Sequence, residues 1–230
     1  MTVSSGTLSF VGGLTNASTL NIGGSLVLTN GGALYVYAGM TNAPKPDYGA
    51  WVNVQADVYL ASNCWIYPAS HPTNGGSVLF TMRHLTISAT NSGISADGLG
   101  FDTSSASQPG FGPGGGKRGG NWGSGGGYGG EGGPGGGQPG GITYGSSNAP
   151  LDAGSAGALN NNSYGGGKGG GLVRIQALRT VTINGVIRAN GTDGNSGGGG
   201  SGGGIHLRCR RVAGTNALVT ANGGSSSINY

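Results

Sequence analysis

The acidic residues are the first candidates for chemistry, because enzymes that cleave glycans act with grouped carboxylates. The chain has only seven of them. Asp97 and Asp102 could form a pair, but no third group accompanies them. At the positions equivalent to Asp97 in later repeats the chain has Asn190 and Asn222, each directly before a glycine. Because Asp or Asn before glycine is typical of a turn with positive φ, we interpret these three as turn residues and expect no catalytic site.

The histidines and lysines do not follow the spacing of a cofactor site. His71, His84 and His206 lie in different repeats, without the short spacing of zinc ligands. Lys117 and Lys168 each follow a glycine directly. Neither has the earlier, first glycine of a phosphate-binding loop, and neither is followed by its Ser or Thr. We therefore expect no metal and no cofactor.

Positive charge is concentrated in the C-terminal third, where seven Lys or Arg follow residue 160 against one acid. A band of such charge suits a polyanion, for example an acidic polysaccharide. The alternative is that it serves solubility or a contact with the next subunit. No nucleic-acid motif accompanies it, so we expect no specific nucleic-acid partner. The candidate contact residues are Arg174, Arg179, Arg208, Arg210 and Arg211.

A repeat positions these residues. Residues 171–191 align without a gap on 203–223, at an offset of 32, and the same pattern occurs in 75–98 and more loosely in 49–70. Each copy holds three short runs that alternate apolar and polar residues, so one face of each run is dry. Three short strands per repeat predict an all-β fold, a right-handed parallel β-helix. A β-sandwich is a poorer interpretation, because antiparallel hairpins do not require the same phrase to return in phase. The predicted inward-facing residues are Val173, Ile175, Ile183, Ile187, Ile205, Leu207, Leu218 and Val219.

The repeat divides the chain into four regions. Residues 1–48 form an N-terminal region of short strands, either the start of the solenoid or strands for subunit contact, and 49–98 form β-helix coils. A glycine-rich insertion covers 99–170, and 171–230 form further coils with a second glycine-rich loop at 192–204. Cys64 and Cys209 fall in coils separated by three steps of ~4.8 Å. This is beyond the ~7 Å reach of a disulfide, so we expect no bridge within the chain, and we expect Cys209 to pack in the core.

The glycine-rich segments all leave the repeat at one corner, so stacked coils place them side by side. Glycine at every third position of 120–137 is typical of polyproline-II-like helices with three residues per turn. We expect an ordered polyglycine-type layer, with Gly126 and Gly129 facing inward. A flexible linker is the alternative, but interleaved Trp122, Tyr128 and Tyr144 favour order.

These phrases, GGG-S-GGG-I-x-L in 198–207 and V-x-I-N-G-x-I-x-A-N-G in 181–191, resemble the glycine-rich β-helical regions of large bacterial surface and secreted proteins. The first forty residues look like the strand repeats of autotransporter-type passenger regions. The glycine layer is also similar, more weakly, to the glycine-rich tip adhesins of some phage tails. The first resemblance implies an extracellular, adhesin-like or matrix-forming protein that is mostly non-enzymatic and often polymeric.

Three functions follow as hypotheses. The first is a subunit of an extracellular fibre or biofilm matrix, the second a glycan-binding surface or phage-tail adhesin, and the third a polysaccharide-active enzyme, which the scarcity of acids disfavours. The start of the chain lacks the pattern of a signal peptide, so we expect either that the chain stays inside the cell or that its leader has been removed; the resemblance implies the second. No apolar run is long enough to span a membrane.

For the fibre we expect strand pairing between the ends of successive copies, because open strand edges recruit other chains. The first strands carry no charge. The residues expected at this contact are Leu8, Phe10, Leu20, Ile22, Ile228 and Tyr230.

Overall fold

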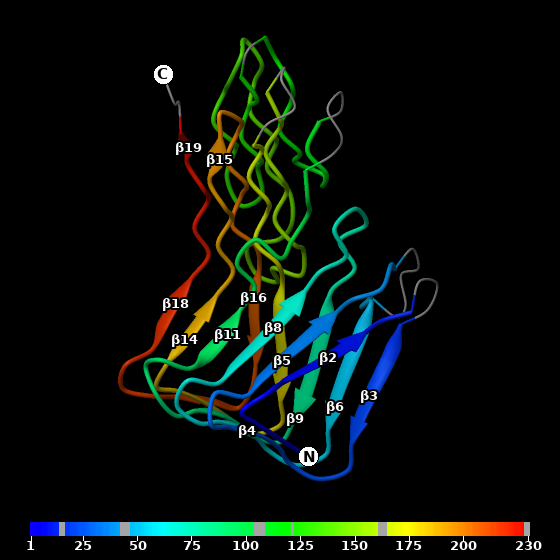
Figure 1. The fold of residues 1–230 in the computed structure, drawn as a ribbon, viewed down its shortest axis with the longest axis vertical. Coiled ribbons are helices and arrows are strands. Elements are labelled where there is room, and N and C mark those ends of the chain that lie inside the picture. The colour runs from blue at the N-terminus through cyan, green and yellow to red at the C-terminus, as the bar shows by residue number, and fades with distance from the viewer. Residues whose placement is uncertain (14–16, 42–46, 104–108, 121, 161–164, 228–230) are drawn as a thin grey trace.

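The computed structural model describes the whole chain except residues 14–16, 42–46, 104–108, 121, 161–164 and 228–230. The described residues form nineteen short β-strands and no helix. Nearly all strands belong to three parallel sheets that run side by side along the molecule (Figure 1).

The chain visits the three sheets in turn. Sheet 1 has the order β1 (Thr2–Ser4), β4 (Leu26–Thr29), β7 (Val58–Leu60), β10 (Leu85–Ile87), β13 (Thr180–Ile183) and β17 (Arg211–Ala213). Sheet 2 has the order β2 (Thr7–Val11), β5 (Ala33–Tyr37), β8 (Trp65–Ala69), β11 (Gly93–Ser95), β14 (Val186–Arg188) and β18 (Leu218–Thr220). Sheet 3 has the order β3 (Ser18–Ile22), β6 (Ala50–Val54), β9 (Val78–Met82), β12 (Val173–Ala177) and β16 (Ile205–Arg208). A separate parallel pair joins β15 (Gly194–Asn195) to β19 (Ser226–Ser227).

Each coil thus contributes one strand to each sheet and pairs with the coils before and after it. This confirms the predicted all-β fold of stacked parallel strands. The offset of 32 places Val173 opposite Ile205 and Val186 opposite Leu218. Residues 1–37 supply the first coils of the same sheets, so the N-terminal strands are the start of the solenoid.

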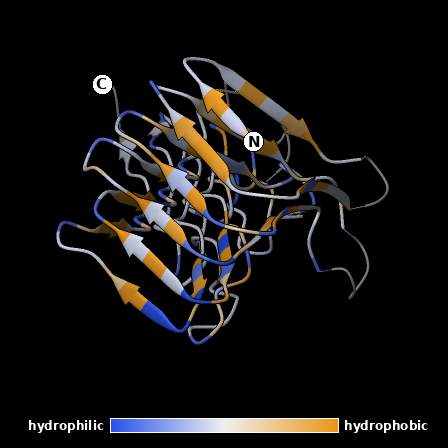
Figure 2. Cartoon of the chain, turned by 90° about the horizontal axis from the view of Figure 1, so that it is seen from below, coloured by the Kyte–Doolittle hydropathy of each residue, from blue (hydrophilic) through white to orange (hydrophobic). Residues whose placement is uncertain are grey.

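The core lies between the three sheets. Side chains alternate along each strand between this interior and the outer surface, visible as the banded strands of Figure 2. Val173, Ile175, Ile183 and Ile187 are all buried, together with their equivalents Val52, Phe80 and Ile94 in earlier coils. Each such side chain contributes roughly 1.5–3 kcal/mol through burial, which is what holds successive coils together.

The last coil departs from the predicted core. Ile205 and Leu207 pack against the core but remain half-buried. Val219 pairs with buried Ile187 and so faces inward, yet it is 48% exposed because no coil covers it. The assignment of Leu218 to the core is wrong: it pairs with Val186 on the outer face.

The predicted offset of 32 residues is also wrong by one residue where β13 pairs with β17. Thr180 pairs with Arg211, an offset of 31, and the offset returns to 32 where Val186 pairs with Leu218; in the turn between these strands Gly214 has a φ of 140°. Only glycine tolerates that backbone conformation readily. Because β13 and β17 thereby align Val181 with Val212, the inward row is kept.

The glycine-rich segments leave the coils after β11, β14 and β18, and rise together at one end of the strands (Figure 1). Backbone hydrogen bonds join them to one another. Gly126 N–H donates to Gly199 O at 2.9 Å, Gly167 N–H to Gly198 O at 2.8 Å, and Gly224 N–H to Gly200 O at 2.8 Å. The described parts of the three excursions therefore form one hydrogen-bonded unit, which we call the glycine lobe (the described residues of 99–172, 189–204 and 221–227).

Two tyrosines anchor the glycine lobe. The rings of Tyr128 and Tyr144 lie 4.9 Å apart, and the Tyr144 hydroxyl accepts a hydrogen bond from Ser155 Oγ and donates to Ala153 O. Burial raises the pKa of Tyr128 to about 12. Trp122, in contrast, is 39% exposed, so the packing expected of the interleaved rings holds for the tyrosines and not for the tryptophan.

Replacing Ile175 by Asp is expected to destabilise the solenoid by several kcal/mol, because a fully buried side chain becomes an unpaired charge. Gln176→Asp, one residue further on the outer face, is the matched control. Urea denaturation of both variants measures the difference. Equal stability would contradict the register of sheet 3.

Gly126→Val should destabilise the glycine lobe, whereas Gly129→Val should be tolerated. A Cβ at Gly126 would lie 2.4 Å from Ser155 O, but a Cβ at Gly129 has nothing within 4 Å, so the expectation that Gly129 faces inward is wrong. We expect a loss of roughly 1–3 kcal/mol for Gly126→Val. Thermal unfolding of the two variants provides the comparison, and a similar melting temperature for both would show that the lobe does not pack as described.

Candidate functional site

Asp97, Asn190 and Asn222 lie at the same corner of three successive coils. Asp97 Oδ1 accepts a hydrogen bond from the N–H of Asn190 at 2.8 Å, and Asn190 Oδ1 accepts one from the N–H of Asn222 at 2.8 Å. None of the three has a positive φ, which occurs instead at Gly98. The predicted positive φ is therefore wrong for all three residues, but Asp97 does lie in a turn, in which the Leu99 N–H donates to Ala96 O at 3.1 Å. They form a ladder of side-chain acceptors that ties the coils together where the glycine lobe begins.

The second oxygen of Asp97 is also engaged. It lies 2.6 Å from Arg188 Nε, which donates to Ser95 Oγ at 3.1 Å as well. The guanidinium carbon of Arg188 stands 5.2 Å from the ring centroid of Trp65. Asp97 therefore acts as an acceptor for a backbone amide and a cation.

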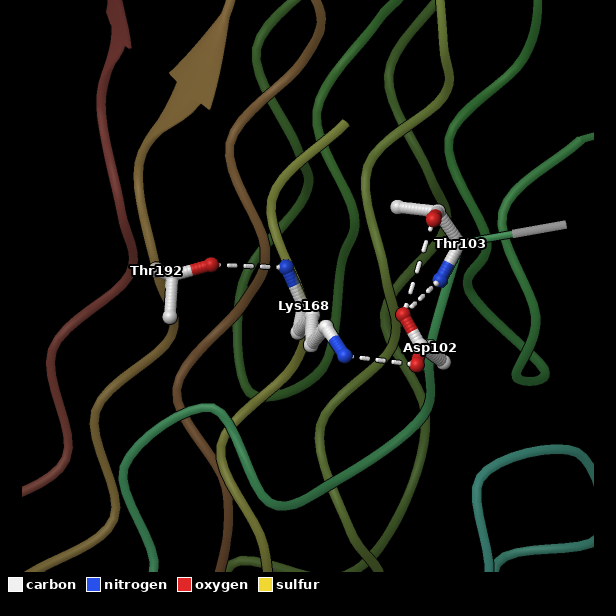
Figure 3. Close-up of polar contacts among 4 residues, drawn as sticks. All are labelled: Asp102, Thr103, Lys168 and Thr192. Carbon is white, nitrogen blue, oxygen red and sulfur yellow. Dashed lines mark hydrogen bonds and ion pairs between the residues drawn. The ribbon is translucent and has the colours of Figure 1, made fainter. Parts of the chain in front are cut away.

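Asp102 has different partners. Figure 3 shows its carboxylate between Lys168, whose Nζ is 2.7 Å from Oδ2, and Thr103, whose N–H donates to Oδ1 at 2.7 Å. The backbone N–H of Lys168 donates in turn to Thr192 Oγ1 at 2.8 Å. This chain of contacts ties the start of the insertion to the loop after β14. Asp97 and Asp102 are thus held by separate cations, and neither carboxylate is left without a partner.

The cysteines and histidines are dispersed. Within the part of the chain that the structure describes, no three His, Cys, Asp or Glu side chains come together as metal ligands. Cys64 and Cys209 are free thiols; Cys64 is buried, but Cys209 is only half-buried because it lies at the last coil. The pKa of His206 is lowered, mainly by its burial and also by the nearby guanidinium groups of Arg174 and Arg208. The positive charge in this region is therefore that of the arginines.

The five candidate arginines fall into two groups. Arg174 is 7% exposed, and its NH2 nitrogen (Nη2) lies 3.0 Å from Asp47 Oδ2, so its assignment as a polyanion contact is wrong. Asp47 precedes β6 and is 127 residues away in sequence, which is why the pairing was not foreseen. The other four, Arg179, Arg208, Arg210 and Arg211, are exposed, and none takes part in an ion pair with another described residue.

The residues expected at the assembly contact lie on the first coil, where the structure describes them. Leu8, Phe10 and Leu20 are half-buried against the core, and Ile22 is buried. Ile228 and Tyr230 lie outside the described residues. On the last coil, Val212 is 60% exposed and Val219 48%. Apolar side chains are therefore uncovered at both ends of the solenoid.

An aromatic row on the outer face of sheet 2 was not anticipated. Tyr35 and Tyr67 pair in register, and their rings stack with centroids 4.4 Å apart. Tyr37 and Trp65 flank them in the same orientation. The signal was present in the sequence as aromatic residues at alternate positions of 35–37 and 65–67.

No family model matches the chain, and comparison with curated proteins and with solved structures finds no match either. Among the described residues there is no helix long and apolar enough to cross a membrane.

Asp97→Ala should destabilise the protein by roughly 1–3 kcal/mol, because the Asn190 amide and Arg188 both lose their acceptor. Asp97→Asn keeps a side-chain oxygen that can accept the Asn190 amide, just as Asn190 accepts the Asn222 amide. This variant loses only the half-exposed ion pair with Arg188, which is worth about 1 kcal/mol or less. Chemical denaturation of both variants separates the two contributions. If both lose the same stability, the ladder contributes nothing.

Proposed function

We propose that the chain is a non-enzymatic structural module of an extracellular fibre or matrix, in which copies associate end to end and continue the solenoid. The observation that carries this proposal is that the edge strands of the same three sheets are exposed at both ends, with uncovered apolar side chains. The resemblance to glycine-rich bacterial surface proteins supports the location, and the separate pairing of Asp97 and Asp102 supports a role without catalysis.

The two ends are complementary. One end presents β16, β17 and β18, and the other presents β3, β1 and β2, which belong to the same sheets in the same order. In sheets 1 and 2, the inward side chains Val212 and Val219 at the first end would meet Val3 and Leu8 at the second. Edge strands are usually protected by charges or proline, but residues 1–22 have neither. Parallel pairing of one end with the other leaves a free end on each partner, so it generates a filament.

We propose further that the coils wind right-handed, as parallel β crossovers do in almost all known sheets. The glycine lobe is proposed to be a layer of polyglycine-type helices. Two observations support this: backbone hydrogen bonds join the segments, and there is no space for a Cβ at Gly123, Gly157 or Gly198. A Cβ added at any of these three glycines would lie within 2.1 Å of a carbonyl oxygen of a neighbouring segment.

Val212→Glu is expected to abolish end-to-end association, because it places a charge on the apolar edge of the last coil. Ile142→Glu is the matched control, since Ile142 is also 60% exposed but lies in the glycine lobe. Light scattering at increasing concentration, with negative-stain microscopy, should show elongated particles for the unchanged protein and for Ile142→Glu. The Val212→Glu variant should remain monomeric.

A mixing experiment tests whether the contact is head to tail. Leu8→Glu blocks the first coil and leaves the last coil intact, whereas Val212→Glu does the reverse. Each variant alone should be monomeric, and an equimolar mixture should give dimers that grow no further. If the unchanged protein stays monomeric at high concentration, the fibre proposal fails and glycan binding replaces it.

A further inference from the structure

A groove on the outer face of sheet 3 runs along the solenoid and reaches the last coil at β16. It has a volume of about 640 Å³ and crosses β6, β9, β12 and β16, which are neighbours in the sheet. Three strand spacings of ~4.8 Å give it a length of about 14 Å along the solenoid axis. Its lining includes Trp51, Gln55, Thr81, Gln176, Arg208 and Arg210.

One side of the groove is fixed by hydrogen bonds. Trp51 Nε1 donates to Thr81 Oγ1 at 2.8 Å, Thr81 Oγ1 donates to Asn53 Oδ1 at 3.0 Å, and Asn53 Nδ2 donates to Asn21 Oδ1 at 3.0 Å. This chain holds the indole ring and the amide in place across three coils. A partner therefore meets polar and aromatic groups whose positions are already set, which lowers the entropic cost of binding.

The other side carries polar groups with unused hydrogen-bonding capacity. The side chains of Gln55, Gln176, Arg208 and Arg210 make no hydrogen bond or ion pair with another described residue. Gln176 pairs in register with Arg208, so an amide and a guanidinium follow one another along the groove. No acidic residue lines it.

We infer that this groove binds a linear acidic polysaccharide. Guanidinium groups match carboxylates in charge and geometry, amides suit hydroxyl groups, and the indole offers an apolar surface. The open, elongated shape fits a polymer chain better than a compact small molecule. The aromatic row of sheet 2 fits less well, because Tyr35 and Tyr67 cover each other's faces and Arg188 stands over Trp65. The inference does not depend on end-to-end association, since all lining residues belong to one copy.

The test compares two pairs of arginines. Arg208→Gln with Arg210→Gln removes the groove's charge, and Arg179→Gln with Arg211→Gln removes the same charge from exposed positions outside the lining. Calorimetric titration with polygalacturonate in about 0.15 M salt measures affinity, and the fully methyl-esterified polymer serves as the uncharged probe. We expect the groove variant to bind about tenfold more weakly or worse, and the control variant to bind nearly as the unchanged protein does.

Three results would overturn the inference: no binding of polygalacturonate, equal binding of the esterified polymer, or equal losses in the two arginine variants. Tighter binding of single-stranded DNA with the same dependence on Arg208 and Arg210 would assign the groove to nucleic acid instead. Repeating the titration in the Val212→Glu background keeps this result separate from the fibre proposal. Binding there at unchanged affinity supports the groove whether or not the chain associates.

Discussion

In-register pairing of each strand with the strand one coil earlier is the constraint on which the rest of the structure depends. Parallel ladders place residue above residue, so every inward position of one coil sits on an inward position of the next. Leu34, Ile66 and Ile94 form such a column in sheet 2, all of them buried. The same rule applied to the outer surface produces the ladder of Asp97, Asn190 and Asn222 and the stacked rings of Tyr35 and Tyr67.

The corner after sheet 2 shows how this constraint accommodates an insertion of more than 70 residues. The insertion leaves after Ala96 and returns before Val173 without disturbing the register on either side, since β9 pairs with β12 and β11 with β14. Glycine allows the segments to approach closely enough for backbone groups to pair, so their N–H and C=O groups are satisfied without a regular sheet. The lobe is thus held by the same kind of bond as the coils, in a different geometry.

The sequence predicted the strands and most of their register, because a period of two and a recurring phrase depend on local residues alone. What it could not provide was the set of neighbours each surface residue meets. Arg174 has the alternation of an outward residue and is one, but Asp47 covers it. Leu207 and Val219 have the alternation of core residues, but no coil lies above them. Gly126 and Gly129 share the same triplet pattern and differ only in what stands opposite, which depends on the packing of distant segments.

The Arg174–Asp47 pair and the glycine lobe also affect how the solenoid resists tension along its axis. In a solenoid with its first and last coils at opposite ends, tension along the axis loads one inter-coil ladder at a time, so the molecule would open coil by coil. The first coil is held mainly by its strand pairing and a few half-buried side chains. Just before β6, Asp47 forms an ion pair with Arg174 of β12. The later coils are joined to one another by backbone hydrogen bonds in the glycine lobe. Extension would therefore begin at the N-terminal coil and stop where these transverse ties start, which makes the C-terminal two thirds the rigid part of the molecule under load.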